Sequence, residues 1–169
     1  MKRLLLALVL ALSSLPAFAF DASDKAGVEA AIRSFDQAFK AGNYNKVIGY
    51  MPPKIMGLIA AQAGMPAEQL EPLIVAQTKA AMANVTVNSN LMDVANMTAG
   101  RTSTGLDYAF VPTTTKMTPN GGAPTTSKTQ TLALEDNGTW YLIRIDGAQH
   151  MKMVRAAYPS FKTIQPPKH

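Results

Sequence analysis

Helical periodicity runs along the chain from about residue 20 to residue 83. In its first part, apolar residues recur three and four positions apart, at Val28, Ala31, Ile32, Phe35, Ala38 and Phe39. This spacing predicts an amphipathic helix that Ser23 or Asp24 caps and that Gly42 follows.

Three shorter helices are predicted after this one. Their ranges are 43–51, 53–64 and 66–83. The boundaries follow from proline, which disfavours a helical residue before it and suits the first turn of a helix. Pro72 lies inside the last range, where it predicts a bend or a restart.

Alternation with period two replaces the helical pattern after residue 84. Segments rich in Val, Thr and Tyr predict four strands, at 84–94, 103–112, 125–135 and 139–146. Asp136-Asn137-Gly138 predicts a tight turn before the last strand, and 118–124 predicts a longer loop between the second and third.

A short helix over 148–157 closes the pattern, with Met151, Val154 and Tyr158 on one side. Helices followed by a meander of strands predict an α+β fold. We expect the N-terminal helices to pack on one face of a curved antiparallel sheet of about four strands, with the C-terminal helix as an addition.

The first 19 residues have the pattern of a signal peptide. Lys2 and Arg3 precede an apolar run from Leu4 to Leu12, and Ala17-Phe18-Ala19 is the small-x-small pattern that signal peptidase cleaves. From Leu4 to Ala19 there are 16 residues, fewer than the roughly 20 that a membrane span needs. The chain has no cysteine for a lipid anchor. We expect a periplasmic protein, with secretion as the alternative, and a single domain over 20–169.

Charge adds little to this picture. Removal of the signal leaves 14 Lys and Arg against 11 Asp and Glu, a net charge of +3. The basic residues are scattered and do not alternate with aromatic ones, so no nucleic-acid partner is predicted. The sequence contains no Gly-rich phosphate loop, Ser-centred elbow or Cys–His pairing, and no cofactor is predicted.

Two stretches of the chain resemble the NTF2-like superfamily, which includes ketosteroid isomerase and SnoaL-like proteins. The range 28–52 is similar to the family's opening helix, glycine-containing break and second helix, and 136–143 is similar to its last hairpin. Asn43 stands where the family often has Asp, and 53–83 is longer than the usual segment before the sheet. The resemblance implies a cone-shaped α+β fold, in which the members that are enzymes hold an acid inside the cone.

Three aspartates are candidates for such an acid, because a carboxylate in an apolar pocket becomes a useful base near neutral pH. Asp107 has the opposite parity to Leu106, Tyr108 and Phe110, so we expect it to point away from the core. Asp36 lies at the border of its helix's apolar stripe, with Lys40 as a surface partner.

Asp93 shares the parity of Val85, Val87 and Leu91, whereas Met92 and Val94 have the other parity. A bulge near Ser89 or Asn90 would turn Met92 inward and leave Asp93 in water, and we favour that arrangement.

His150 is a further weak candidate, for proton transfer or for soft copper together with the methionines. Met153 shares its helical face, but Met151 does not, and the other methionines are dispersed through apolar patterns. Core packing explains them better, so no metal site is predicted.

The predicted function is non-catalytic binding of a small apolar molecule or a protein partner. The residues expected to bind the ligand form an apolar set with one cation: Leu106, Tyr108, Phe110, Tyr141, Ile143 and Arg144. An isomerase or dehydratase that uses Asp93 is the alternative, and an inhibitor or immunity protein is a third class.

The last strand is apolar on both faces, with Trp140 and Leu142 opposite Tyr141 and Ile143. An exposed patch that contains tryptophan marks an interface. We therefore expect the C-terminal helix, or a second copy of the chain in a homodimer, to cover Trp140 and Leu142.

Overall fold

The computed structural model describes residues 20–168, so the predicted signal peptide lies outside the described residues. Four helices come first, at α1 (Ala22–Lys40), α2 (Tyr44–Ile48), α3 (Pro53–Ala63) and α4 (Ala67–Met82). The strands follow, at β1 (Val85–Met92), β2 (Thr98–Arg101), β3 (Asp107–Pro119), β4 (Thr125–Asp136) and β5 (Thr139–Ile145). The 3₁₀ turn η1 (Val94–Asn96) separates β1 from β2, and α5 (Ala148–Ala157) and η2 (Pro159–Phe161) end the fold.

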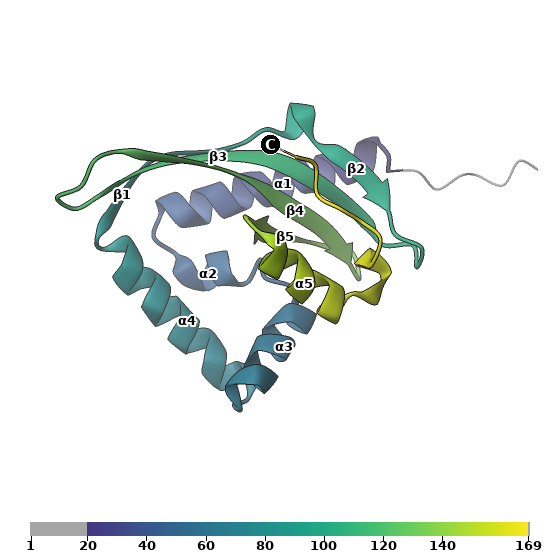
Figure 1. Cartoon of the computed structure of the whole chain (residues 1–169), viewed down its shortest axis with the longest axis horizontal. Coiled ribbons are helices and arrows are strands. Elements are labelled where there is room, and N and C mark those ends of the chain that lie inside the picture. Colours follow the sequence, from purple (N-terminus) through teal and green to yellow (C-terminus); the bar gives the residue numbers. More distant parts are fainter. Residues whose placement is uncertain (1–19, 169) are drawn as a thin grey trace, which may run out of the picture.

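The sheet is antiparallel and curled like half a barrel (Figure 1). Its strand order is β1-β3-β4-β5, and β2 pairs with β3 beyond the end of β1. The predicted α+β class, the antiparallel sheet and the short C-terminal helix are all confirmed.

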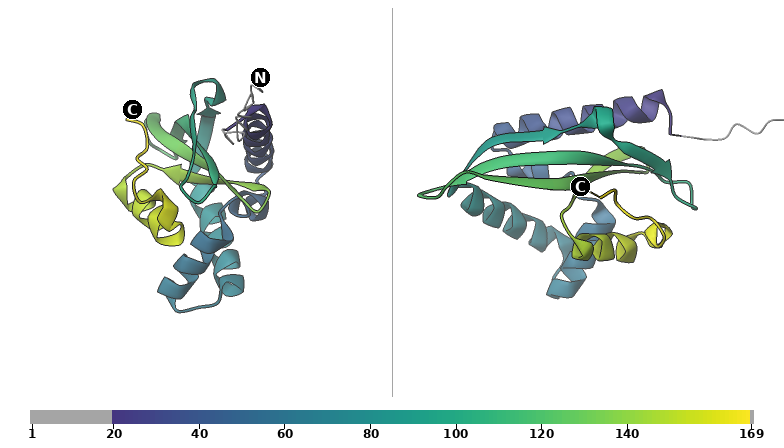
Figure 2. Two further views of the ribbon diagram at one scale, coloured as in Figure 1. Left: turned by 90° about the vertical axis from the view of Figure 1, so that its right-hand side faces the viewer. Right: turned by 45° about the horizontal axis from the view of Figure 1, so that its top comes forward.

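Helices cover both faces of the sheet, with α1 on one side and α5 on the other (Figure 2). The N-terminal helix α3 lies on the same side as α5, so the expectation that the N-terminal helices share one face is wrong. On one face, Ala109, Val111, Ala133 and Leu142 of the sheet pack against Val28 and Ala31 of α1. On the other face, Phe110, Leu132, Leu134, Ile143 and Ile145 of the sheet pack against residues of α3, α5 and η2 and of the link between the last two: Ile55, Met151, Val154, Tyr158 and Phe161. Both faces are apolar enough to need a cover, which the two ends of the described chain supply.

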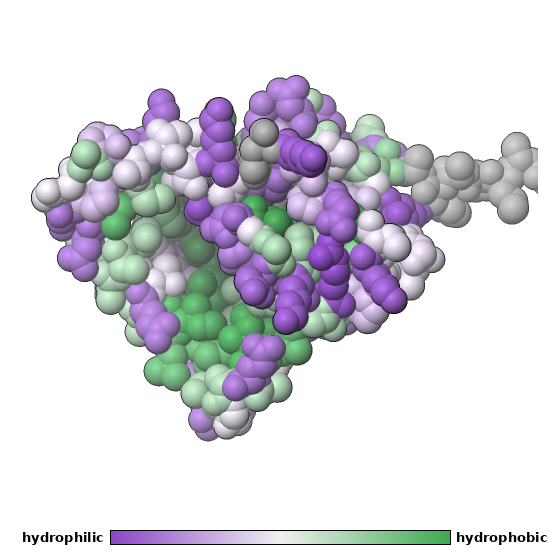
Figure 3. All heavy atoms as spheres, in the orientation of Figure 1, coloured by the Kyte–Doolittle hydropathy of each residue, from purple (hydrophilic) through white to green (hydrophobic). Residues whose placement is uncertain are grey.

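A third cluster joins the helices below the sheet. Met56, Ala60 and Leu70 are buried between α3 and α4. Hydrophobic surface gathers over this part of the molecule, where the face in Figure 3 is also hollowed. Helix α4 continues through Pro72, so the helix does not restart there.

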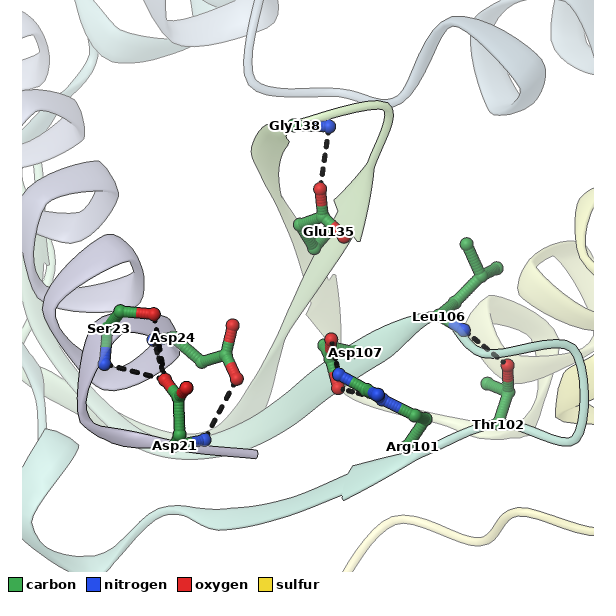
Figure 4. Close-up of polar contacts among 9 residues, drawn as sticks. All are labelled: Asp21, Ser23, Asp24, Arg101, Thr102, Leu106, Asp107, Glu135 and Gly138. Carbon is green, nitrogen blue, oxygen red and sulfur yellow. Dashed lines mark hydrogen bonds and ion pairs between the residues drawn. The ribbon is translucent and has the colours of Figure 1, made fainter. Parts of the chain in front are cut away.

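The start of α1 lies earlier than predicted. Asp21, rather than Ser23 or Asp24, caps the helix by accepting from the Ser23 and Asp24 amides, and the Asp24 carboxylate accepts from the Asp21 amide at 2.8 Å. This reciprocal pair is a capping box (Figure 4). The amide donors, with Asp24 first, lower the pKa of the Asp21 carboxyl because they favour its charged form.

Strand β3 is shifted and longer than the predicted range 103–112. Residues 102–106 form a turn, in which Gly105 has a φ of 89° and the Thr102 amide donates to the Leu106 carbonyl at 2.9 Å. At the other end the strand continues to Pro119, so the connection to β4 is shorter than the predicted 118–124 loop.

Pro112 lies inside this central strand without breaking it. Its carbonyl accepts from the Asp93 amide at 2.8 Å, at the gap between β1 and β2. A residue's nitrogen and carbonyl point to the same side of a strand, so the missing N–H faces this gap and no ladder bond is lost there.

Strand β2 was not predicted. Its residues are Thr98-Ala99-Gly100-Arg101, which have neither strong alternation nor large apolar side chains. Gly100 lets the Tyr108 ring approach, since a β-carbon there would lie 2.7 Å from its hydroxyl oxygen.

Among helices over residues 20–168, none has the length and apolar character needed to cross a bilayer.

Candidate functional site

A cavity of about 180 Å³ lies between the second half of α1, the end of α4 and the sheet. Its walls are mostly apolar and come from Phe35, Phe39, Met82, Val85, Val87, Met92 and Met117. Its polar lining comes from Asn90, Thr113, Thr115, Thr131 and Arg144. Unbranched, polarisable methionine side chains adapt to ligands of irregular shape.

A β-bulge gives β1 the side chains that face this cavity. The β1–β3 register shifts between Val87 and Ser89, which confirms the predicted bulge close to the predicted position. Val87 on one side of it, and Asn90 and Met92 on the other, all line the cavity, whereas Leu91 is 63% exposed.

Four buried threonines lie on the sheet face beneath the cavity: Thr113, Thr115, Thr129 and Thr131. The Thr113 hydroxyl donates to the Val111 carbonyl at 3.1 Å and lies 2.8 Å from the Thr131 hydroxyl. The Thr115 hydroxyl donates to Asn90 Oδ1 at 2.8 Å. The Thr129 hydroxyl makes no hydrogen bond to the described residues. The floor of the cavity is thus polar, although its walls are not.

Arg144 closes the cavity on the β5 side. Its Nε donates to Asp146 Oδ2 at 3.2 Å, and one terminal nitrogen donates to Ser127 Oγ at 3.2 Å. The Arg144 side chain is 46% exposed, so its ion pair with Asp146 is in contact with water.

A second hollow of about 310 Å³ adjoins the cavity and shares Phe39, Met82, Val85, Val87 and Asn90 with it. Asp36 and Lys40 line its outer part and form an ion pair at 2.6 Å. This is the surface pairing predicted for Asp36.

The predicted ligand-binding residues do not form one site. Leu106, Tyr108, Phe110 and Ile143 pack in the cluster beneath α5 and η2. Tyr141 lies on the same face of the sheet, beside Met51 and Met56, whereas Arg144 lies on the opposite face, at the cavity. A ligand-binding role for these residues stays a prediction, but the cavity is lined by a different set.

The predicted interface residues pack against α1 and not against the C-terminal helix. Leu142 is buried in the cluster with Val28 and Ala31 of α1, and Trp140 packs against the same cluster. The Phe20 and Trp140 rings meet edge to face, with centroids 6.0 Å apart. The apolar surface on this face of β5 is the docking site of α1.

The remaining catalytic candidates lie apart from the cavity. Asp93 caps η1, where it accepts from the Asn96 amide at 3.3 Å and from Asn96 Nδ2 at 2.7 Å. His150 Nδ1 lies 2.7 Å from Asp146 Oδ1, on the first turn of α5. The structure brings neither residue together with Asp36.

Asp107 lies on the opposite face of the sheet to Tyr108 and Phe110, as its parity predicts, but it is buried, so the expectation that it points away from the core is wrong. The unpredicted strand β2 supplies Arg101, whose guanidinium makes a two-point contact with the Asp107 carboxylate (Figure 4). This contact raises the pKa of Arg101. Helix α1 covers the face of the sheet on which Asp107 lies. The two-point contact with Arg101 compensates the Asp107 carboxylate for the hydration that it loses by burial.

A second buried polar group fastens α5 to the last hairpin. The Tyr158 hydroxyl donates to Asp136 Oδ2 at 2.9 Å, and Lys54 Nζ lies 2.9 Å from the same oxygen. Lys54 Nζ also lies 4.8 Å from the centroid of the Tyr158 ring. Burial, reinforced by the hydrogen bond to Asp136, raises the pKa of Tyr158.

The sequence interpretation missed the cavity's polar floor. Thr113 and Thr115 lie beyond the predicted strand 103–112, whereas Thr129 and Thr131 lie inside the predicted strand 125–135. In the structure all four share one face of the sheet. Within the predicted strand 125–135, alternation alone could have placed Thr129 and Thr131 on one face. Their position beneath the second half of α1 depends on tertiary packing that no local pattern encodes.

Comparison of the chain with models of known families, with curated proteins and with solved structures finds no match.

Proposed function

We propose that this chain is an exported member of the NTF2-like superfamily that binds a small, mostly apolar ligand without catalysing its conversion. The cavity between α1, α4 and the sheet carries the proposal. The curled sheet with N-terminal helices is compatible with the superfamily and supports the assignment.

The walls and the size of the cavity favour such a ligand. Ligand sites are mostly apolar with a few polar groups that orient the ligand, and this cavity has that composition. A dry cavity of about 150 Å³ can hold benzene. The present cavity of about 180 Å³ is therefore large enough for a somewhat bigger molecule, and the adjoining hollow gives room for a longer one.

The positions of the acids favour binding over proton transfer. A general base must lie within hydrogen-bond reach of the substrate. Asp93 is engaged as the cap of η1, and Asp36 is paired with Lys40 on the outer part of the adjoining hollow.

Export to the periplasm rests on the leader pattern of residues 1–19.

Methionine methyl groups offer a direct test of the proposal. In protein labelled with ¹³C at the methionine methyls, titration with 1-octanol or toluene should shift the signals of Met82, Met92 and Met117, which line the cavity. The signals of Met56 and Met151 should stay in place, because these residues lie in other clusters. If no cavity methyl moves with either probe, the proposed function is wrong.

A pair of variants on β1 controls for unspecific binding. Val87→Phe adds bulk to the cavity wall and should abolish the shifts, whereas Leu91→Phe adds bulk at an exposed position four residues away and should leave them unchanged. Equal loss in both variants would contradict binding in the cavity.

A further inference from the structure

A row of polar residues crosses the sheet beneath the cavity. Asn90 on β1 is paired with Thr115 on β3, which is paired with Ser127 on β4. Ser127 Oγ in turn accepts a hydrogen bond from Arg144 on β5. Four strands thus contribute to one continuous polar row, which ends in a cation.

The guanidinium at the end of this row has donors left for a ligand. Arginine carries five N–H groups, and the described contacts of Arg144 use two nitrogens, toward Asp146 and Ser127. Because both side chains of the Arg144–Asp146 pair are at least 40% exposed, water screens the pair and it is weak. A carboxylate that reaches Arg144 from the cavity can therefore compete for it.

Asn90 adds a second donor on the cavity side. Its Oδ1 accepts from the Thr115 hydroxyl, which leaves the amide N–H groups without a partner among the described residues. The Thr113 hydroxyl donates its one proton to the Val111 carbonyl. In its contact with Thr131, Thr113 is therefore the acceptor and Thr131 is the donor, so both hydroxyl protons are already used. The strongest unused groups are thus the N–H donors of Arg144 and Asn90, which favour a ligand head that accepts hydrogen bonds and carries negative charge.

We propose that the ligand is an amphiphilic carboxylate, with its head at Arg144 and Asn90 and its apolar body among the methionines and phenylalanines of the walls. This inference rests on the proposed function, because it concerns the same cavity. The body fills the cavity and reaches the adjoining hollow along Met82, Val85 and Val87, which line both. A medium-chain or aromatic monocarboxylic acid has this chemistry.

Three probes with the same eight-carbon chain test the head group. Octanoate, 1-octanol and octylamine are titrated by calorimetry and by the methionine methyl signals at neutral pH and low salt. Octanoate should bind about tenfold more tightly than 1-octanol, and octylamine should bind most weakly, because a charge-assisted hydrogen bond is stronger than a neutral one.

Arg144→Gln should remove the tenfold preference for octanoate over 1-octanol. Lys116→Gln removes the same charge from an exposed position whose parity places it on the opposite face of the sheet, and it should retain the preference. Circular dichroism and urea unfolding establish that both variants are folded.

The outcomes separate this inference from the proposed function. If wild-type protein binds octanoate and 1-octanol equally and Val87→Phe blocks both, the cavity binds apolar ligands and the carboxylate inference is wrong. A preference for octanoate that survives in Arg144→Gln also overturns it. If none of the three probes moves the cavity methyls, both proposals fail.

Discussion

At the scale of single residues, Gly27 is the described glycine that a neighbouring side chain approaches most closely, and that side chain is Trp140. A β-carbon at Gly27 would lie 2.3 Å from Trp140 Nε1 and 2.6 Å from Cδ1. The indole thus lies directly on the backbone of α1, and only glycine at this position permits the contact. Gly57, on α3, has no atom within 4 Å of the corresponding position.

We predict opposite effects of alanine at these two glycines. Gly57→Ala should raise the free energy of unfolding by about 0.5–1 kcal/mol, because alanine is the better helix former. Gly27→Ala should lower it by about 1–3 kcal/mol, because the tryptophan must move. Urea unfolding measures both. Equal stabilisation by the two substitutions would show that the indole does not lie against α1.

Tyr158 gives a prediction about alkaline pH. Its pKa is raised, so the hydroxyl stays protonated in the folded protein at a pH where the unfolded chain loses the proton. The resulting stabilisation is fully present below about pH 10, the ordinary pKa of tyrosine, and is lost as the pH rises above it.

Tyr158→Phe removes this contribution. At pH 8 the variant should be about 1–2 kcal/mol less stable than wild type, since Asp136 loses a buried donor. The difference should shrink above pH 10, in urea unfolding followed from pH 8 to pH 11. A difference that stays constant over this range would contradict the assigned hydrogen bond.

Sequence patterns predicted the environment of some residues and not of others. The bulge in β1 could be predicted because an unbroken strand would leave either Val87 or Met92 in water. The burial of Asp107 could not, because its partner Arg101 belongs to a strand without a hydrophobic pattern. A buried ion pair depends on two segments together, and each segment alone indicates exposure.

At the scale of the elements, the bulge determines which side chains of β1 reach the cavity. A shift of one residue exchanges the two faces of a strand. Leu91 is therefore exposed, although it is apolar, and Met92 lines the cavity wall next to it.

Lysine at these two neighbours should have very different effects. Leu91→Lys should change the free energy of unfolding by no more than about 0.5 kcal/mol, as surface substitutions do. Met92→Lys should lower it by about 1–3 kcal/mol, because it brings a charge against the apolar cluster of α1. Similar losses in both variants would place the bulge elsewhere.

Helices and strands with clear periodicity were predicted closely. The range of α5 agrees with the predicted 148–157, and β4 and β5 differ from prediction by no more than a residue at an end. Periodicity shows which side of an element is apolar, but not which partner covers it. For that reason the pattern predicts a cover for Trp140, by the C-terminal helix or by a second copy of the chain, but does not indicate α1, which packs there.

At the scale of the whole molecule, the sheet is enclosed between the first and last helices. Removal of residues 147–169 would expose the apolar face that contains Phe110, Leu132 and Leu134. We predict that a chain ending at Asp146 loses cooperative thermal unfolding and binds a hydrophobic dye, since α5, Tyr158 and η2 together contribute four fully or nearly fully buried side chains to this face.

A chain ending at Gln165 is the matched control. It keeps α5, η2 and the carbonyls of Phe161 and Ile164 that Arg155 binds. It should melt within a few degrees of the full chain in calorimetry. If the chain ending at Asp146 melts as cooperatively as this control, the C-terminal helix is not part of the core.

The contact between α1 and β5 also has a consequence for the order of folding. Gly27 and Trp140 are neighbours in space but lie at opposite ends of the described chain, and the β5 amide of Leu142 donates to the Tyr50 carbonyl at 2.9 Å. Contacts of such long sequence separation slow folding. During synthesis, the docking surface of the first helix stays incomplete until the last strand emerges, because Leu142 and Trp140 form part of it.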